Sequence, residues 1–229
     1  MSIVENLCLN SFVKNGHEVH LYTYEKDISI PQGVRKRNAN EILPQTEIFT
    51  YSNGPGKGSF SGFSNFFRYK LLGLKGGWWA DTDVIALKPF EFDEDFVFAS
   101  ENQKDGINEK HISSCVIKAK HSSAIFNEAY QICSQKIKSD ISWGETGPRL
   151  VHALVNKHGL QKYVKDTQFF NPVDYFHFNQ ILIERDNEID LSLSVAVHLW
   201  NEMWRRNGIN KDDNFPVDSL FENLKSKYL

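Results

Sequence analysis

Residues 76–87 read Gly-Gly-Trp-Trp-Ala-Asp-Thr-Asp-Val-Ile-Ala-Leu, an apolar run broken by two acidic residues. The apolar residues predict a β-strand over residues 78–86. Because residues i and i+2 of an extended chain point to the same side, we expect the carboxylates of Asp81 and Asp83 to converge. Two like charges repel each other in apolar surroundings, and a divalent cation such as Mn²⁺ or Mg²⁺ would remove that conflict. The segment therefore predicts a metal site.

The sequence on either side of this segment alternates between strand and helix patterns. Helical spacing covers residues 2–14, 63–75, 122–138, 148–158, 200–206 and 220–229, and strand patterns cover residues 17–24, 96–100, 112–119, 163–173 and 191–198. Such alternation favours an α/β fold with a mostly parallel sheet flanked by helices. No linker composition or internal repeat interrupts it, so residues 1–229 are predicted to form a single domain.

The composition excludes several classes of protein. Apolar residues make up 41% of the chain and charged residues 24%, which argues against disorder and fibrous folds. The formal net charge of −3 lacks the basic excess of nucleic-acid-binding proteins. The longest stretch without a charged residue runs only from Leu191 to Asn201, too short to span a bilayer. With three cysteines and no signal-peptide pattern, we expect a cytoplasmic protein with at most peripheral membrane contact.

Three further side chains are candidates for a binding site. Asn65 and Arg68 are three residues apart on the predicted helix 63–75, so they share a face. The guanidinium of Arg68 could hold a carboxylate, a phosphate or sugar hydroxyls, although a surface arginine is the simpler alternative. His198 ends a predicted strand and could bind a metal or a diphosphate, or it could make only a structural hydrogen bond.

Together, Ser64-Asn-Phe-Phe-Arg-Tyr and Gly76-Gly-Trp-Trp-Ala-Asp-Thr-Asp resemble the DxD sugar-binding region of glycosyltransferases. This group includes bacterial capsular and lipopolysaccharide transferases, initiating mannosyltransferases and α-1,4-galactosyltransferase-like enzymes. Its pattern is roughly S-D-x-x-R-Y followed by G-G-x-Y-x-D-x-D, and the spacing from Arg68 to Asp81 matches it. The resemblance implies that Arg68 and Asp81 contact the donor sugar and that Asp83 binds the metal. Asn65 stands where the family usually has aspartate.

The resemblance extends to two segments nearer the C-terminus. The family's His-x-Trp segment corresponds to His198-Leu-Trp200, which implies a second metal ligand in His198 and a substrate contact in Trp200. The family's T-G-P segment, beside the acceptor pocket, corresponds to Thr146-Gly-Pro148. The implied substrate-binding residues are Asn65, Arg68, Asp81, Thr146, Gly147 and Trp200.

By this resemblance the chain is a GT-A-type enzyme, with a nucleotide-sugar-binding half at 1–100 and an acceptor-side half at 101–229. It would use Mn²⁺ or Mg²⁺ to move a hexose, with retention, from a nucleotide sugar, most simply a UDP-sugar, to a glycan or lipid-linked acceptor. Polysaccharide or lipopolysaccharide synthesis is the expected process. These enzymes usually open with a strand that this sequence lacks before residue 2, and a sheet without that edge could pair with a second copy. Two alternatives stay open: a nucleotidyltransferase on a similar sheet, and a non-catalytic domain that binds a sugar nucleotide or carbohydrate.

Overall fold

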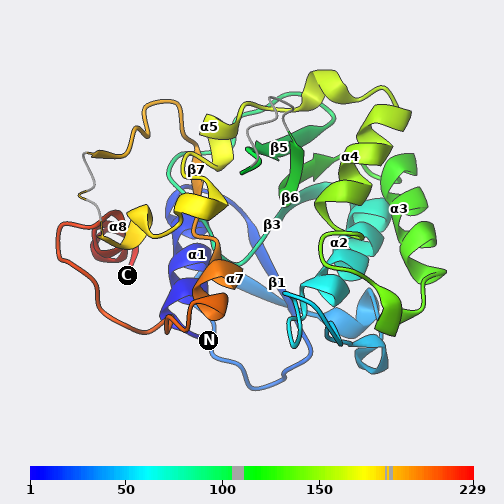
Figure 1. The fold of residues 1–229 in the computed structure, drawn as a ribbon, viewed down its shortest axis with the longest axis horizontal. Helices are drawn as coiled ribbons and strands as arrows, with labels where there is room; N and C mark the ends of the chain where they lie inside the picture. The colour runs from blue at the N-terminus through cyan, green and yellow to red at the C-terminus, as the bar shows by residue number, and fades with distance from the viewer. Residues whose placement is uncertain (105–110, 184, 186–187) are drawn as a thin grey trace. The chain divides into compact units, whose positions relative to one another are not determined.

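Helices and strands both form along this chain, and the computed structural model describes them over residues 1–104, 111–183, 185 and 188–229 (Figure 1). The predicted mixed α/β class is therefore confirmed. The chain forms two compact units, each assembled from separate stretches of sequence. The first comprises Met1–Arg37, Asp81–Glu91 and Asp166–Leu229, and the second comprises Asn38–Ala80 and Phe92–Lys165.

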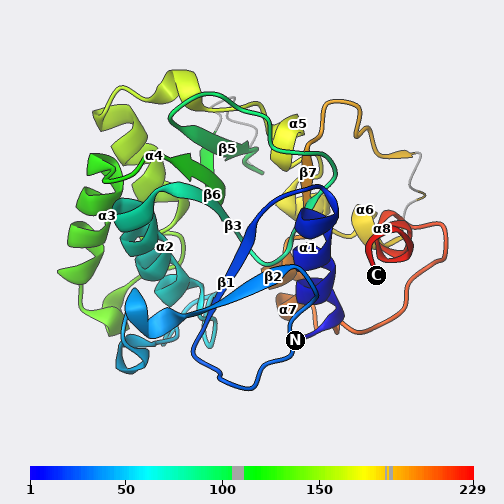
Figure 2. The ribbon, with the colours of Figure 1, turned by 180° about the vertical axis from the view of Figure 1, so that it is seen from behind.

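The first unit contains the N-terminal helix, short strands and the C-terminal helices. Its elements are α1 (Ile3–Lys14), β1 (Val19–Thr23), β2 (Val34–Asn38), β4 (Val84–Ala86), α5 (Thr167–Phe170), α6 (Gln180–Ile183), β7 (Ala196–His198), α7 (Asn201–Arg206) and α8 (Leu220–Tyr228), with a short 3₁₀ helix at Tyr175–His177. Strands β1 and β2 form a two-stranded sheet (Figure 2), and β4 pairs with β7. The sequence did not predict β2, whose residues after Val34 are exposed and polar.

Helix α1 organises the core of the first unit. It begins with a capping box between Ser2 and Glu5, as its sequence predicts. Its apolar face packs against β4 and α8, where buried residues of all three elements form one cluster. On the same face, the Ser11 hydroxyl accepts from the Ala86 amide (2.9 Å), and the Asn15 side chain donates to the Ala86 carbonyl (3.0 Å). Side chains of α1 and of its C-cap residue thus satisfy the backbone at the end of β4.

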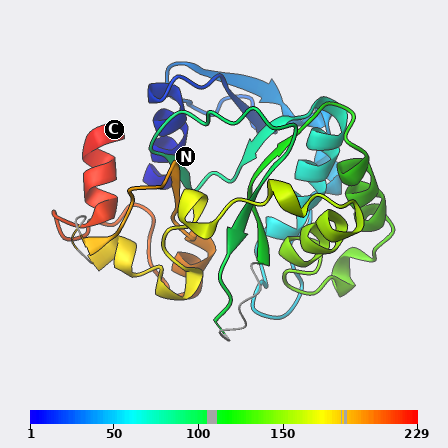
Figure 3. The same cartoon turned by 90° about the horizontal axis from the view of Figure 1, so that it is seen from above.

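The second unit places helices beside a three-stranded sheet. Its elements are α2 (Ser61–Lys75), β3 (Gly77–Ala80), β5 (Val97–Glu101), β6 (His111–Ala119), α3 (Ala124–Ser134) and α4 (Pro148–Lys157), with 3₁₀ helices at Ala39–Glu41, Gln45–Glu47, Lys138–Asp140 and Gln161–Tyr163. The strand order is β3-β6-β5. Helices α2 and α3 pack together and α4 packs on β6, so the three helices gather beside the sheet (Figure 3).

The expectation of a mostly parallel sheet is wrong. The pairings of β3 with β6, β5 with β6 and β4 with β7 are all antiparallel. Parallel pairing also occurs, as in the bridge Phe98↔Val164, so the sheets of this fold are small and mixed. The reason lies partly in the connections: only residues 102–110 join β5 to β6, and a parallel crossover needs roughly a dozen residues or more.

The strand predicted over residues 163–173 is also wrong. After a 3₁₀ turn, the chain forms the short helix α5, and the carboxylate of Asp166 caps it by accepting from the Gln168 amide. Thr167 and Phe170 are the buried residues of this helix. Across the described ranges, no helix combines the length and apolar character needed to cross a bilayer.

Two glycines at the junction of α2 and β3 allow a matched pair of substitutions. Gly76 has φ +64° and ψ −154°, a combination that only glycine adopts readily, and an added Cβ would lie 2.5 Å from the His121 amide nitrogen. Gly77 also has positive φ, +83°, but an added Cβ there would meet nothing within 4 Å. We expect Gly76→Ala to lower the free energy of unfolding by about 3 kcal/mol or more, and Gly77→Ala by about 1–2 kcal/mol. Urea denaturation followed by circular dichroism measures both, and equal losses would contradict this account of Gly76.

Candidate metal site

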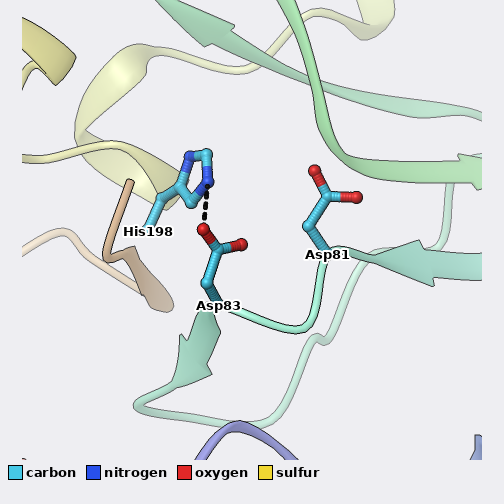
Figure 4. Close-up of side chains that lie close together, drawn as sticks. All are labelled: Asp81, Asp83 and His198. Atoms are coloured by element: carbon cyan, nitrogen blue, oxygen red, sulfur yellow. Dashed lines mark ion pairs between the residues drawn. The ribbon is translucent and has the colours of Figure 1, made fainter. Parts of the chain in front are cut away.

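The two acidic residues lie in a turn, so the single strand predicted over residues 78–86 is wrong. Strand β3 ends at Ala80, β4 begins at Val84, and the amide of Val84 donates to the Asp81 carbonyl (3.0 Å). Both carboxylates nevertheless project to the same side of this turn (Figure 4). Their predicted convergence is correct, but it results from the turn and not from the alternation of an extended strand.

His198 reaches this turn through strand pairing. Strands β4 and β7 are antiparallel with Val84 opposite His198, which places the histidine beside the residue that precedes Val84. The His198 Nε2 atom lies 3.4 Å from the Asp83 Oδ2 atom (Figure 4). One ligand atom from each of Asp81, Asp83 and His198 lies within 4.8 Å of the others.

Backbone amides hold Asp83 in place. The Asn201 amide at the start of α7 donates to Asp83 Oδ2 (2.8 Å), and the Leu199 amide donates to the Asp83 carbonyl (2.9 Å). Burial by itself would raise the pKa of Asp83. The positive charge and hydrogen bond of His198, together with the Asn201 amide, outweigh burial and lower that pKa. Asp83 is therefore a carboxylate that the fold keeps ionised.

The imidazole ring of His198 is enclosed on its other sides. Its Nδ1 atom lies 3.1 Å from Asn171 Oδ1, and its ring centre lies 3.9 Å from that of Trp200. Trp200 has φ +56°, which is rare for a bulky residue, and its indole Nε1 donates to the Val173 carbonyl (2.7 Å). These contacts restrict how the ring can turn.

The three side chains fit a divalent cation. Two carboxylates and an imidazole suit Mn²⁺, and carboxylates alone suit Mg²⁺. Ligand atoms lie about 2.1 Å from such an ion, so opposite ligands are separated by about 4.2 Å. The separations of up to 4.8 Å are therefore wider than those of ligands on one ion, and the three side chains would draw together on binding it. Three protein ligands would leave positions open for oxygen atoms of a substrate.

Four of the predicted substrate-binding residues form a network within the second unit. Arg68 is 3% exposed and donates from Nη1 to Asn65 Oδ1 (2.9 Å), and its guanidinium lies over the Trp79 ring at 4.8 Å. The Asn65 amide reaches the Thr146 hydroxyl (3.4 Å). A Cβ at Gly147 would lie 3.1 Å from Asn65 Nδ2, so the backbone at this position packs closely on the asparagine.

The predicted residues thus fall into two groups. Asp81, Asp83, His198 and Trp200 belong to the first unit, where they lie around the turn and the end of β7. Asn65, Arg68, Thr146 and Gly147 belong to the second unit. The substrate contacts assigned to these residues by resemblance stay predictions.

Sequence reasoning missed two residues that contact the site. Asn201 contributes its backbone amide, which no pattern of side chains reveals. Asn171 follows α5, in a segment predicted to be a strand, and nothing in that pattern marked it as polar and buried. The Asp166 cap was the available signal for a helix there.

Comparisons with known proteins identify no family for this chain. No family model matches it, and no curated protein matches it. Among solved structures, it is similar to one described as "PaToxG Glycosyltransferase", with a TM-score of 0.49 and 11% sequence identity over all of this chain and 80% of that chain. At that identity and TM-score, the likeness establishes neither a family nor a function.

Proposed function

We propose that this chain is a metal-dependent glycosyltransferase of the GT-A type. It would transfer a hexose from a nucleoside-diphosphate sugar, a UDP-sugar in the first instance, to a hydroxyl group of a glycan or lipid-linked acceptor. The observation that carries the proposal is the convergence of Asp81, Asp83 and His198. The spacing of Arg68 from Asp81 in the sequence supports it independently.

The chemistry of the proposed reaction explains why such a site is needed. The bond between the anomeric carbon and the diphosphate oxygen breaks, and a bond to the acceptor oxygen forms as the acceptor hydroxyl loses its proton. Mn²⁺ or Mg²⁺ held by Asp83, His198 and Asp81 would neutralise negative charge on the departing diphosphate. The amide of Asn201 already orients the Asp83 carboxylate for this role.

Arg68 has the properties expected of a residue that orients a sugar. Its guanidinium is fixed by Asn65 on one edge and by the face of Trp79, so little side-chain entropy remains to be lost on binding. In this proposal Arg68 and Asp81 bind donor hydroxyl groups, and Thr146, Gly147 and Trp200 contribute further substrate contacts. Retention of anomeric configuration, a place in polysaccharide or lipopolysaccharide synthesis and a peripheral cytoplasmic location belong to the same proposal.

The test is a panel of UDP- and GDP-sugars incubated with the protein and Mn²⁺, with release of nucleoside diphosphate measured over time. We expect release from at least one donor, by transfer or by slow transfer to water, and we expect excess EDTA to abolish it. Restoring Mn²⁺ should restore the rate. A rate that is unchanged by EDTA would contradict metal dependence.

The same panel separates the two alternatives. A nucleotidyltransferase supplied with a sugar phosphate and a nucleoside triphosphate releases pyrophosphate in place of nucleoside diphosphate. A non-catalytic domain binds a sugar nucleotide, as calorimetry would show, yet releases nothing with Mn²⁺ present. Either result would overturn the proposal of glycosyl transfer.

A further inference from the structure

We propose that Asn171 is a positioning residue that holds His198 in the tautomer able to bind the cation. The proposal rests on the proposed metal site, because it concerns how one of that site's ligands is oriented. Asn171 is 2% exposed and lies away from Asp83, on the far edge of the histidine ring.

The contacts of the ring define the role of the asparagine. His198 has Asn171 Oδ1 at its Nδ1 atom (3.1 Å) and Asp83 Oδ2 near its Nε2 atom (3.4 Å). An amide oxygen can only accept, so the Nδ1 atom must carry a proton to form this hydrogen bond. Without a cation, a protonated His198 also pairs with Asp83 through Nε2; when a cation replaces that Nε2 proton, Nδ1 keeps the single proton of a neutral imidazole and the lone pair of Nε2 faces the ion. That lone pair is what a cation bound to Asp83 requires.

The backbone fixes where Asn171 lies. The helix α5, which precedes it, is joined to the segment that enters β7: the Val195 amide donates to the Phe169 carbonyl (2.9 Å), and the Ser194 hydroxyl donates to the Gln168 carbonyl (2.7 Å). The Asn171 amide itself donates to the Thr167 carbonyl (2.7 Å).

A second attachment follows the asparagine. The indole of Trp200 donates to the Val173 carbonyl (2.7 Å), so the chain is tied down on both sides of Asn171. Strand β7 ends at His198, and Trp200 lies two residues further along. The same short segment therefore positions the His198 ring and, through Trp200, the chain beside Asn171. This arrangement holds the amide oxygen against Nδ1.

Two substitutions of Asn171, one that removes the acceptor oxygen and one that keeps it, test its role in positioning His198. Asn171→Leu keeps the approximate size but removes the acceptor, and Asn171→Asp keeps an acceptor oxygen. By calorimetric titration with Mn²⁺, we expect Asn171→Leu to weaken the affinity about 10- to 100-fold and Asn171→Asp to leave it within about threefold of the unmodified protein. Asn179→Leu, at an exposed position of the same unit, is the matched control and should bind normally. Affinity within threefold for Asn171→Leu, or an equal loss for Asn171→Asp, would overturn the proposal.

A spectroscopic measurement tests the tautomer without a variant at Asn171. In protein labelled with ¹⁵N-histidine and loaded with diamagnetic Zn²⁺, we expect the His198 signal, assigned with His198→Gln, to show a protonated Nδ1 and a metal-bound Nε2. Zn²⁺ on Nδ1 would overturn the proposal even if Asn171→Leu did not fold. If the unmodified protein bound neither Mn²⁺ nor Zn²⁺, the proposed metal-dependent function would fail and this inference with it. Normal metal binding with the wrong tautomer would overturn only the role of Asn171.

Discussion

Replacing Asp83 with asparagine is expected to lower Mn²⁺-dependent release of nucleoside diphosphate by at least about a thousandfold, equivalent to about 4 kcal/mol at the transition state. The substitution removes one negative charge from the three-ligand group but keeps the size of the side chain. Its amide oxygen can still accept from the Asn201 backbone, so the turn between β3 and β4 should persist. The loss therefore reports on charge and metal binding more than on folding.

The control for this prediction is Asp190→Asn. Asp190 is an exposed aspartate of the same unit, where it accepts from the Ser192 amide. The Asp190→Asn substitution changes the net charge by the same amount as Asp83→Asn, and the turnover of this variant should equal that of the unmodified protein. Steady-state rates at saturating donor and Mn²⁺ provide the comparison. If Asp83→Asn retained more than about a tenth of the activity, a role for Asp83 in holding the metal would be untenable.

The second large effect is on stability, at Trp204. This side chain of α7 is fully buried, and its ring packs edge-to-face on Phe215 and Phe221 at centroid distances of 5.8 and 5.1 Å. Truncation to alanine removes a large buried surface and leaves a cavity, so we expect Trp204→Ala to lower the free energy of unfolding by about 3–5 kcal/mol. Since α7 begins at Asn201, loosening this helix should also weaken the hydrogen bond that the Asn201 amide donates to Asp83.

Trp204→Phe separates the contribution of ring packing to stability from that of the indole N–H group. Among the described residues, the Trp204 Nε1 atom is buried without a hydrogen-bond partner, so phenylalanine removes an unsatisfied donor as well as volume. We expect this variant to lose less than about 2 kcal/mol. Urea denaturation followed by circular dichroism measures both variants. A loss for Trp204→Phe as large as that for Trp204→Ala would show that the indole makes an interaction beyond packing.

Local sequence signals predicted those elements whose stability is decided by neighbouring residues. The Ser2 and Glu5 capping box marked the start of α1, and Gly76 marked the end of α2. The convergence of Asp81 and Asp83 was also predictable, because residues two apart lie close together in a turn as well as in a strand. Whether the segment was extended could not be decided from its apolar neighbours, since the two halves pair with different strands.

Contacts between distant residues could not be derived from local sequence patterns, and only the resemblance pointed to His198 as a metal ligand. The placement of His198 depends on β4 pairing with β7, and more than a hundred residues separate these strands. The direction of strand pairing has the same origin, because alternation of elements along a sequence does not specify which strands become neighbours. Asn171 was missed since its burial results from tertiary attachments of α5 and not from any local pattern.

The most direct test of the account is a titration of the metal-free protein with Mn²⁺, followed by electron paramagnetic resonance of the free ion. The account predicts a single Mn²⁺ bound per chain, with affinity lowered at least about tenfold by each of Asp81→Asn, Asp83→Asn and His198→Gln and unchanged by Asp190→Asn. The absence of Mn²⁺ binding, or equal binding by all of these proteins, would contradict the claim that the three side chains form a cation site.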